Sequence, residues 1–109
     1  MRYELRVRPQ VESDIEAAAL WYEERQPGLG GEFIHEVCQA MARLALNPII
    51  YPIRHRRYPV RWMFANRFPY RIVFLVEEEI ITVLCLVHAK RHDRVWKERL
   101  TRPDLPPQE

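Results

Sequence analysis

The sequence predicts an α+β fold of order β-α-α-β-β-β-α, in which a helical hairpin packs on one face of a small, mostly antiparallel sheet. Three observations support it: a strand pattern at the start, two helix patterns joined by a Pro-Gly turn, and three strand patterns in the second half. The 109 residues, 48% of them hydrophobic, are enough for one domain with a small core. We expect that domain to span residues 1–102, followed by a Pro-rich tail at 103–109.

The first half of the chain predicts one strand and the first helix. Apolar and charged residues alternate over residues 3–7, which is typical of a half-buried strand. Pro9 then suits the first turn of a helix, because its missing N–H has no partner there. The helical pattern ends at Pro27. The capping-box spacing of Ser13 and Glu16 leaves open a start a few residues later.

A second helix and three strands follow. The apolar stripe Phe33–Leu44 ends at Asn47-Pro48, and the short turn before it predicts an antiparallel helical hairpin. Strand patterns run over about 58–64, 70–76 and 80–87.

The strands are not equivalent, and a short helix follows them. Pro59 marks the first of the three as an edge strand, because proline cannot donate to a ladder. The last is apolar on both faces, which predicts a central, covered position. Residues 93–100 predict one or two turns of helix that carry Trp96.

The composition excludes several classes of protein. The chain begins without an apolar signal-peptide core and has no run of about 20 apolar residues, so we expect a cytoplasmic protein that does not contact a membrane. Cys38 and Cys85 lie singly within apolar patterns, which predicts two reduced, buried cysteines. No cluster of Cys and His has ligand spacing, and we expect neither a metal nor a cofactor.

The positive charge is concentrated in one stretch. The net charge is only +2, but residues 37–76 contain no acidic residue. The same stretch holds seven arginines: Arg43, Arg54, Arg56, Arg57, Arg61, Arg67 and Arg71. Arginine presents a planar fork that suits phosphate or carboxylate, so we interpret the stretch as an anion-binding surface for nucleic acid or an acidic protein segment. A merely solvated basic face, or a genome that favours arginine codons, is the alternative.

From about residue 6 to residue 100 the chain resembles the RelE/ParE toxin superfamily. The residues that carry the resemblance are Asp14-Ile15, Trp21-Tyr22-Glu23, Pro27-Gly28-Leu29-Gly30, Phe33, Asn47-Pro48, Tyr51-Pro52, Phe68-Pro69-Tyr70-Arg71-Ile72, His88, Lys90-Arg91 and Trp96. No single motif is diagnostic, but the ordered set at these spacings is specific.

The resemblance implies the toxin of a type II toxin–antitoxin system, of the kind also described as plasmid stabilisation proteins that inhibit growth. It implies a cognate antitoxin that folds along the toxin and binds operator DNA, so that the toxin reaches DNA only indirectly. RelE-like members cut messenger RNA on the ribosome, whereas ParE-like members inhibit DNA gyrase. The tyrosine–proline loop and the Phe-Pro-Tyr strand are slightly more similar to the ParE branch.

If the chain is a nuclease, the resemblance assigns its catalytic residues. Arg71 matches a strand arginine that stabilises phosphate, and His88 and Arg91 lie where the family places residues after its last strand. Histidine suits proton transfer because its unperturbed pKa is close to neutral. A structural contact or antitoxin docking for Arg71, and a strand-end role for His88, are the alternatives.

Other residues are candidates for binding the antitoxin or the target: Arg54, Arg57, Arg61, Trp62, Phe64, Arg67, Trp96 and Arg99. Trp62 and Phe64 lie on the predicted edge strand and are natural anchors for an added strand or helix. Trp96 and Arg99 belong to the last helix, which either binds the target or packs back on the sheet. We interpret Trp21 and Tyr22 as core or helix-packing residues.

Two departures argue against a RelE-type mechanism. The only lysines are Lys90 and Lys97, so the middle strands have no lysine cluster, and no tyrosine follows Tyr70. The leading hypothesis is therefore a ParE-like toxin that inhibits gyrase by direct binding. The alternatives are a ribosome-dependent endoribonuclease and an inactive homologue that retains only antitoxin binding and operon regulation.

Overall fold

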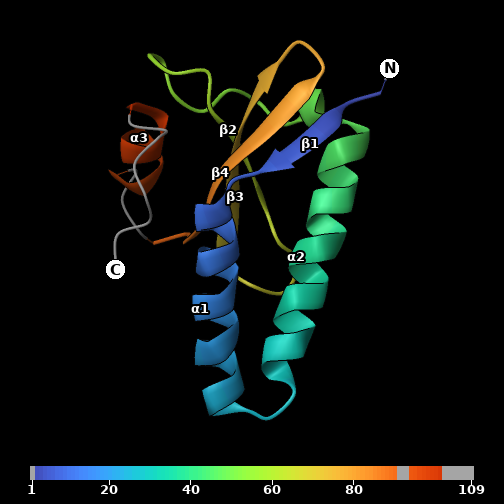
Figure 1. Cartoon of the computed structure of the whole chain (residues 1–109), viewed down its shortest axis with the longest axis vertical. Coiled ribbons are helices and arrows are strands. Elements are labelled where there is room, and N and C mark those ends of the chain that lie inside the picture. Colours follow the sequence, from blue (N-terminus) through green and yellow to red (C-terminus); the bar gives the residue numbers. More distant parts are fainter. Residues whose placement is uncertain (1, 91–93, 102–109) are drawn as a thin grey trace.

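The structure, a computed structural model, describes residues 2–90 and 94–101. Its elements are β1 (Glu4–Val7), α1 (Pro9–Arg25), α2 (Leu29–Leu46), the short 3-10 helix η1 (Pro48–Ile50), β2 (Arg61–Phe64), β3 (Tyr70–Glu77), β4 (Ile80–His88) and α3 (Arg94–Thr101) (Figure 1). The predicted class and element order are confirmed. The predicted tail at 103–109 lies outside the described residues.

The four strands form one sheet in the order β1-β4-β3-β2. β1 runs parallel to β4, and the β4–β3 and β3–β2 pairs are antiparallel. β2 is thus an edge strand and β4 a central one, as predicted. The β3–β4 ladder contains a bulge: Val73 is opposite Cys85 and Phe74 is opposite Val83, so Leu84 has no opposite residue.

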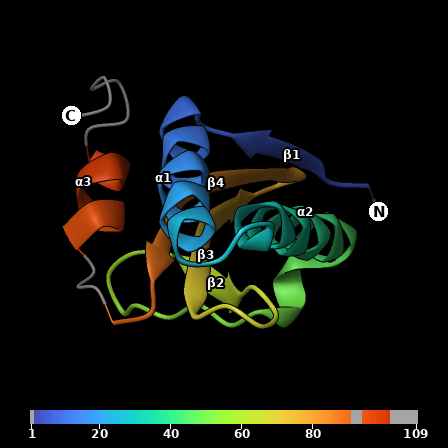
Figure 2. The same ribbon diagram turned by 90° about the horizontal axis from the view of Figure 1, so that it is seen from below.

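The α1–α2 hairpin covers one face of the sheet, which we call the hairpin face (Figures 1 and 2). Both helices contribute buried residues to the core beneath it, including Val11, Phe33 and Leu44, against Ile72 and Phe74 of β3. This larger core holds the fold together, because apolar burial is the dominant favourable term in folding.

The turn between the two helices is fixed by a glycine pair and a carboxylate. Gly28 has a φ of 90°, and a Cβ on Gly30 would lie 2.6 Å from the Ala19 carbonyl oxygen, so the helices approach closely only because Gly30 has no side chain. The Glu23 carboxylate accepts hydrogen bonds from the backbone N–H groups of Gly28 and Gly30 at 2.9–3.1 Å. Glu23 therefore satisfies backbone donors at the start of α2.

The opposite face, which we call the outer face, carries a smaller core beneath α3. Trp96 is 0% exposed and packs with Val60, Val73, Leu84 and other buried residues. The helix therefore packs back on the sheet, which was one of the two alternatives considered for it. No helix among the described residues is long and apolar enough to cross a membrane.

Several local predictions were wrong. Cys38 is exposed and Trp21 is half-exposed, although both were expected in the core. Each adjoins a residue that does face the sheet, Val37 or Tyr22. Neighbouring helical residues point about 100° apart, so only one of each pair reaches the core.

The limits of two elements also differ from expectation. β2 begins only at Arg61, two residues after Pro59, which cannot donate to a ladder. α1 begins at Pro9 with no side-chain cap, so the capping-box alternative is not used.

Candidate functional site

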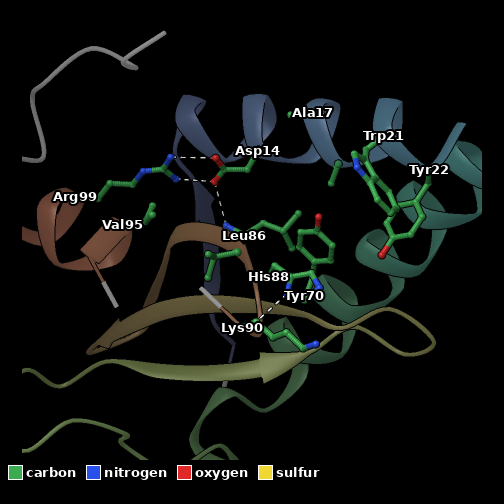
Figure 3. A pocket seen from close by; sticks show the side chains of 12 residues that line it. Asp14, Ala17, Trp21, Tyr22, Tyr70, Leu86, His88, Lys90, Val95 and Arg99 are labelled. Atoms are coloured by element: carbon green, nitrogen blue, oxygen red, sulfur yellow. Dashed lines mark hydrogen bonds and ion pairs between the residues drawn. The ribbon is translucent and has the colours of Figure 1, made fainter. Parts of the chain in front are cut away.

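A groove of about 850 Å³ opens between α1, α3 and the ends of β3 and β4 (Figure 3). Its lining is mostly apolar and aromatic, with a few polar groups, which is typical of binding sites. The residues that line it are Asp14, Ala17, Ala18, Trp21, Tyr22, Tyr70, Leu86, Val87, His88, Lys90, Val95 and Arg99. The small side chains of Ala17 and Ala18 leave the space beside α1 open.

Aromatic rings line the groove at its α1 side. The Tyr22 ring contacts those of Trp21 and Tyr70, with centroids 5.1 and 6.3 Å apart. Burial, and secondly the neighbouring Tyr70, raise the pKa of Tyr22 above its usual value. Trp21 is half-exposed, and the Arg25 guanidinium lies 3.4 Å from its ring centroid. The cation holds the indole in place at the surface.

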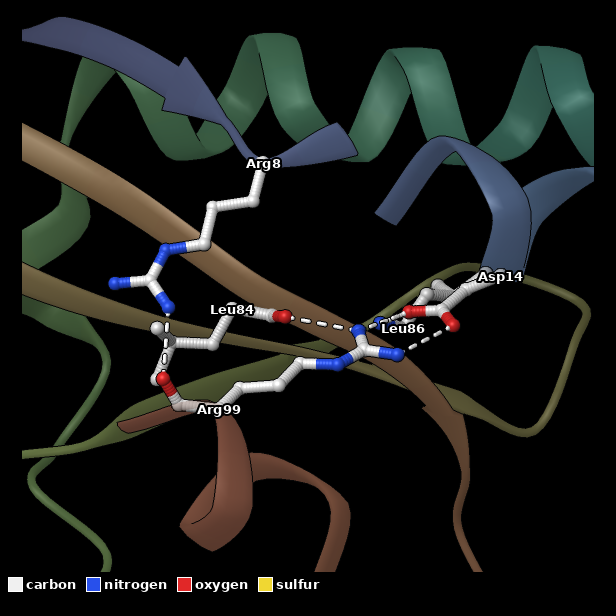
Figure 4. A network of polar contacts seen from close by, with 5 residues as sticks. All are labelled: Arg8, Asp14, Leu84, Leu86 and Arg99. Carbon is white, nitrogen blue, oxygen red and sulfur yellow. Dashed lines mark hydrogen bonds and ion pairs between the residues drawn. The ribbon is translucent and has the colours of Figure 1, made fainter. Parts of the chain in front are cut away.

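A network of polar contacts between Asp14 and Arg99 joins α1, β4 and α3 (Figure 4). Arg99 donates to both carboxylate oxygens of Asp14, at 2.6 and 3.0 Å, and to the Leu84 carbonyl at 3.0 Å. Asp14 also accepts from the Leu86 N–H at 3.0 Å, and Arg8 donates to the Arg99 carbonyl at 2.8 Å. Burial opposes the charge on Arg99, but Asp14 outweighs it and raises the pKa of Arg99. The network holds α3, and with it one wall of the groove, against the domain.

His88 and Lys90 lie at the β4 end of the groove. The His88 ring is 5.3 Å from the Tyr70 ring, and its Nδ1 accepts the Lys90 N–H at 3.1 Å. The Nδ1 atom of His88 therefore already accepts a hydrogen bond from the backbone just after β4. The Lys90 side chain is exposed, so the groove carries a positive charge at its rim.

The structure places Arg71 and His88 on opposite faces of the sheet. His88 is opposite Tyr70 in the ladder, and both side chains lie on the hairpin face. Arg71 is the next residue along β3, so its side chain lies on the outer face, opposite Val87 of the smaller core. Its guanidinium carbon lies 4.7 Å from the Trp62 ring centroid.

A second candidate surface lies on the outer face at β2, where Trp62 stands between two arginines. We call Arg54, Trp62, Phe64 and Arg71 the arginine–tryptophan surface. The Arg54 guanidinium is 5.6 Å from the Trp62 ring, on which Arg71 also lies. Phe64 is opposite Arg71 in the ladder and is 49% exposed. This surface therefore combines exposed aromatic area with positive charge.

The other predicted binding residues have contacts within the protein. Arg61 donates to the Tyr51 carbonyl at 2.6 Å and ties the loop before β2 to that strand. Arg67 pairs with Glu32 of α2 at 3.1 Å. Trp96 has no exposed area to offer a partner in this conformation. Arg99 belongs to the network with Asp14.

The remaining predicted residues fall into two groups. Arg57 is exposed and, like Arg54, has no ion pair with a carboxylate among the described residues. Arg91 lies outside the described residues. Within the part of the chain that the structure describes, no group of three or more His, Cys, Asp or Glu residues could hold a metal ion.

The sequence reasoning missed the groove and Asp14. One signal was present: Asp14 lies three residues after Val11 and four before Ala18, within the apolar stripe of α1. A carboxylate on a buried stripe requires a partner. The partner is 85 residues away, so no local pattern could identify it.

Comparisons with known proteins agree with this architecture. The fold is similar to a protein described as the chromosomal ParDE TA system from P. aeruginosa, with a TM-score of 0.71, 18% identity, and 82% of this chain and 98% of that one covered. It is also similar to E. coli toxin RelE, solved in the free state with two arginines replaced by alanine. That match has a TM-score of 0.61, 15% identity, and coverage of 94% and 98%.

Sequence comparison assigns the family. No curated protein matches the chain. However, residues 5–93 match the family model described as the ParE toxin of type II toxin-antitoxin system, parDE. Because this match covers well over half of the sequence, the chain belongs to the ParE toxin family of type II toxin–antitoxin systems.

Proposed function

We propose that this chain is a cytoplasmic toxin that inhibits DNA gyrase by direct binding and is neutralised by a cognate antitoxin. The family membership supports the toxin–antitoxin part of the proposal. The choice of binding over RNA cleavage rests on the separation of Arg71 from His88.

RNA cleavage by 2′-OH attack requires proton-transfer groups and a cation at the same phosphate. In this chain the candidate cation, Arg71, is on the outer face and is only 7% exposed. The candidate proton-transfer group, His88, is in the groove on the hairpin face. A single phosphate cannot contact both through the intervening sheet, which favours a toxin that acts by binding.

The arginine–tryptophan surface supports the antitoxin part of the proposal. It belongs to the stretch 37–76, which contains no acidic residue, and it presents the exposed ring of Phe64 and the half-buried ring of Trp62, with the exposed Arg54 beside Trp62. An acidic antitoxin segment with an aromatic or aliphatic anchor is complementary in both charge and polarity. We infer that Trp62 is the central anchor residue of this contact, because tryptophan and arginine dominate the binding energy of interfaces.

The target is tested with the purified toxin in two assays. We expect inhibited gyrase supercoiling, and intact messenger RNA when the toxin is added to translating ribosomes. Cleavage within codons, abolished in Arg71→Ala, would instead establish the endoribonuclease that uses Arg71, His88 and Arg91. If the toxin neither inhibits gyrase nor cleaves messenger RNA, and its expression leaves growth unchanged, the chain is an inactive homologue.

The antitoxin contact is tested by a pair of tryptophan variants. Trp62→Ala is expected to raise the Kd for the antitoxin encoded beside the toxin by about 30-fold, or about 2 kcal/mol. Trp21→Ala removes a half-exposed tryptophan from the groove and serves as the matched control. An affinity of Trp62→Ala equal to that of the wild type in titration calorimetry would reject the arginine–tryptophan surface as the antitoxin site.

A further inference from the structure

The free edge of β1 is the feature from which a further interaction can be derived. Among the described residues, β1 pairs only with β4, so its other edge has no strand beside it. Figure 2 shows β1 at the margin of the ribbon. A strand edge of this kind presents backbone donors and acceptors that another strand can use.

The alternation of backbone hydrogen bonds along β1 determines which residues direct their N–H and C=O groups to the free edge. The Glu4 N–H donates to the Glu79 carbonyl at 2.7 Å, so Glu4, and by alternation Arg6, direct their backbone groups at the neighbouring strand. The backbone groups of Leu5 and Val7 therefore point to the free edge. An added antiparallel strand must form its hydrogen-bonded pairs with Leu5 and Val7.

The charges on β1 make this edge complementary to itself. Glu4 and Arg6 are exposed, and they form an ion pair with each other within the chain. If two copies pair antiparallel with Leu5 opposite Leu5, each Glu4 lies opposite Arg6 of the other copy. These are the non-hydrogen-bonded positions, where the side chains of opposite residues lie closest.

The neighbouring registers are disfavoured by like charges. A shift by two residues in one direction places Glu4 opposite Glu4, and a shift in the other places Arg6 opposite Arg6. Like charges directly opposite each other destabilise a strand pair. Arg8 lies just beyond the strand, where its guanidinium bonds to the Arg99 carbonyl and is directed at α3.

We propose that β1 pairs with β1 of a second copy of this chain, antiparallel and centred on Leu5, so that the two sheets become continuous across a two-fold axis. The pairing adds two Glu4–Arg6 contacts and uses the outward N–H and C=O groups of Leu5 and Val7. It is independent of the antitoxin proposal, because the arginine–tryptophan surface takes no part in the pairing. A four-residue strand is a small interface, so the dimer is weak, with a Kd on the order of 10–100 μM.

The test is a charge-swap series in sedimentation equilibrium on the full chain. The wild type is expected to approach twice the monomer mass as concentration rises. Glu4→Arg and Arg6→Glu each place like charges opposite each other twice, and each is expected to raise the dimer Kd at least about tenfold. The double variant Glu4→Arg/Arg6→Glu restores opposite charges and should restore the dimer. Glu24→Arg, at an exposed position of α1, is the control for the change in net charge.

Amide hydrogen exchange identifies the edge directly. In a β1-paired dimer, the Leu5 and Val7 amides gain protection as concentration rises, whereas those of Glu4 and Arg6, already bonded to β4, do not. A chain that stays monomeric overturns the proposal, as does a dimer that survives both single substitutions. In that case the charged, short β1 only prevents strand addition. Far-UV circular dichroism verifies that each variant is folded.

Discussion

The two faces of the sheet are covered in different ways. The hairpin face lies beneath two helices of 17 and 18 residues, joined by a turn that Glu23 and Gly30 fix. The outer face lies beneath one helix of eight residues, held by Trp96 and by the Arg99–Asp14 network.

The difference separates stability from binding. The hairpin face contributes the larger apolar core, and little of the sheet is exposed on that side. On the outer face α3 covers only part of the sheet: Phe64 is exposed, and Trp62 is half-buried beside Arg54. Partner contacts are therefore expected where the smaller core ends, and the groove lies where the two covers meet.

Core truncations on the two faces should separate these roles most clearly. Phe33→Ala is expected to lower the free energy of unfolding by about 3–5 kcal/mol, because it removes a fully buried ring from the larger core. Trp96→Ala removes a larger buried ring, but from the smaller core beneath a single eight-residue helix, so we expect a smaller loss in global stability. Urea unfolding measures both values. A Trp96→Ala loss that equals or exceeds the Phe33→Ala loss would show that the two covers unfold as one unit.

Two of the ion pairs among the described residues give a second, smaller contrast. Asp14→Asn removes the charge that Arg99 contacts in a part-buried position, and we expect a loss of about 1–3 kcal/mol. Glu32→Gln removes the charge from the exposed pair with Arg67 and should cost about 0–1 kcal/mol. Thermal unfolding at low and high salt compares them. Similar losses for both variants would mean that the network does not hold α3.

The two cysteines provide the mildest probe of the same arrangement. Cys38 is exposed on α2, whereas Cys85 lies in the core of the outer face, where burial raises its pKa to about 12. Thiol titration of the native chain should modify only Cys38, and Cys85 should react once the chain is unfolded. The folded state favours the neutral Cys85 thiol, so the free energy of unfolding should fall as pH rises from about 9 to 12, where the unfolded chain loses this proton first. In Cys85→Ala this fall should be smaller. Native reactivity of Cys85 would indicate that α3 opens readily.

Local periodicity was enough to predict the elements and their order. The alternation over residues 3–7 correctly predicted β1, and the apolar stripe Phe33–Leu44 correctly predicted α2, because each pattern depends only on neighbouring residues. The two-sided apolar pattern of β4 predicted its central place in the sheet for the same reason. The predictions that Trp21 and Cys38 are buried were wrong, because a helical pattern shows how often residues are buried but does not separate a buried residue from its immediate neighbour.

The site could be predicted only in part. Trp62 and Phe64 were candidates because they lie on an edge strand marked by Pro59, and in the structure Phe64 is exposed and Trp62 is half-buried beside Arg54. The groove depends on the packing of α3 against α1, a contact between the two ends of the sequence. The roles of Arg61 and Arg67 depend on carbonyl and carboxylate partners in distant segments, which charge composition alone does not reveal.

The bulge opposite Val73 has a consequence for chemistry as well as for shape. Leu84 and Cys85 are consecutive, yet both point to the outer face, so every later residue of β4 has its side reversed. A regular ladder through the same residues would place His88 on the face that carries Arg71. The one-residue bulge in β4 thus determines whether the His88 imidazole and the Arg71 guanidinium can contact one phosphate. In this chain it places them on opposite faces of the sheet.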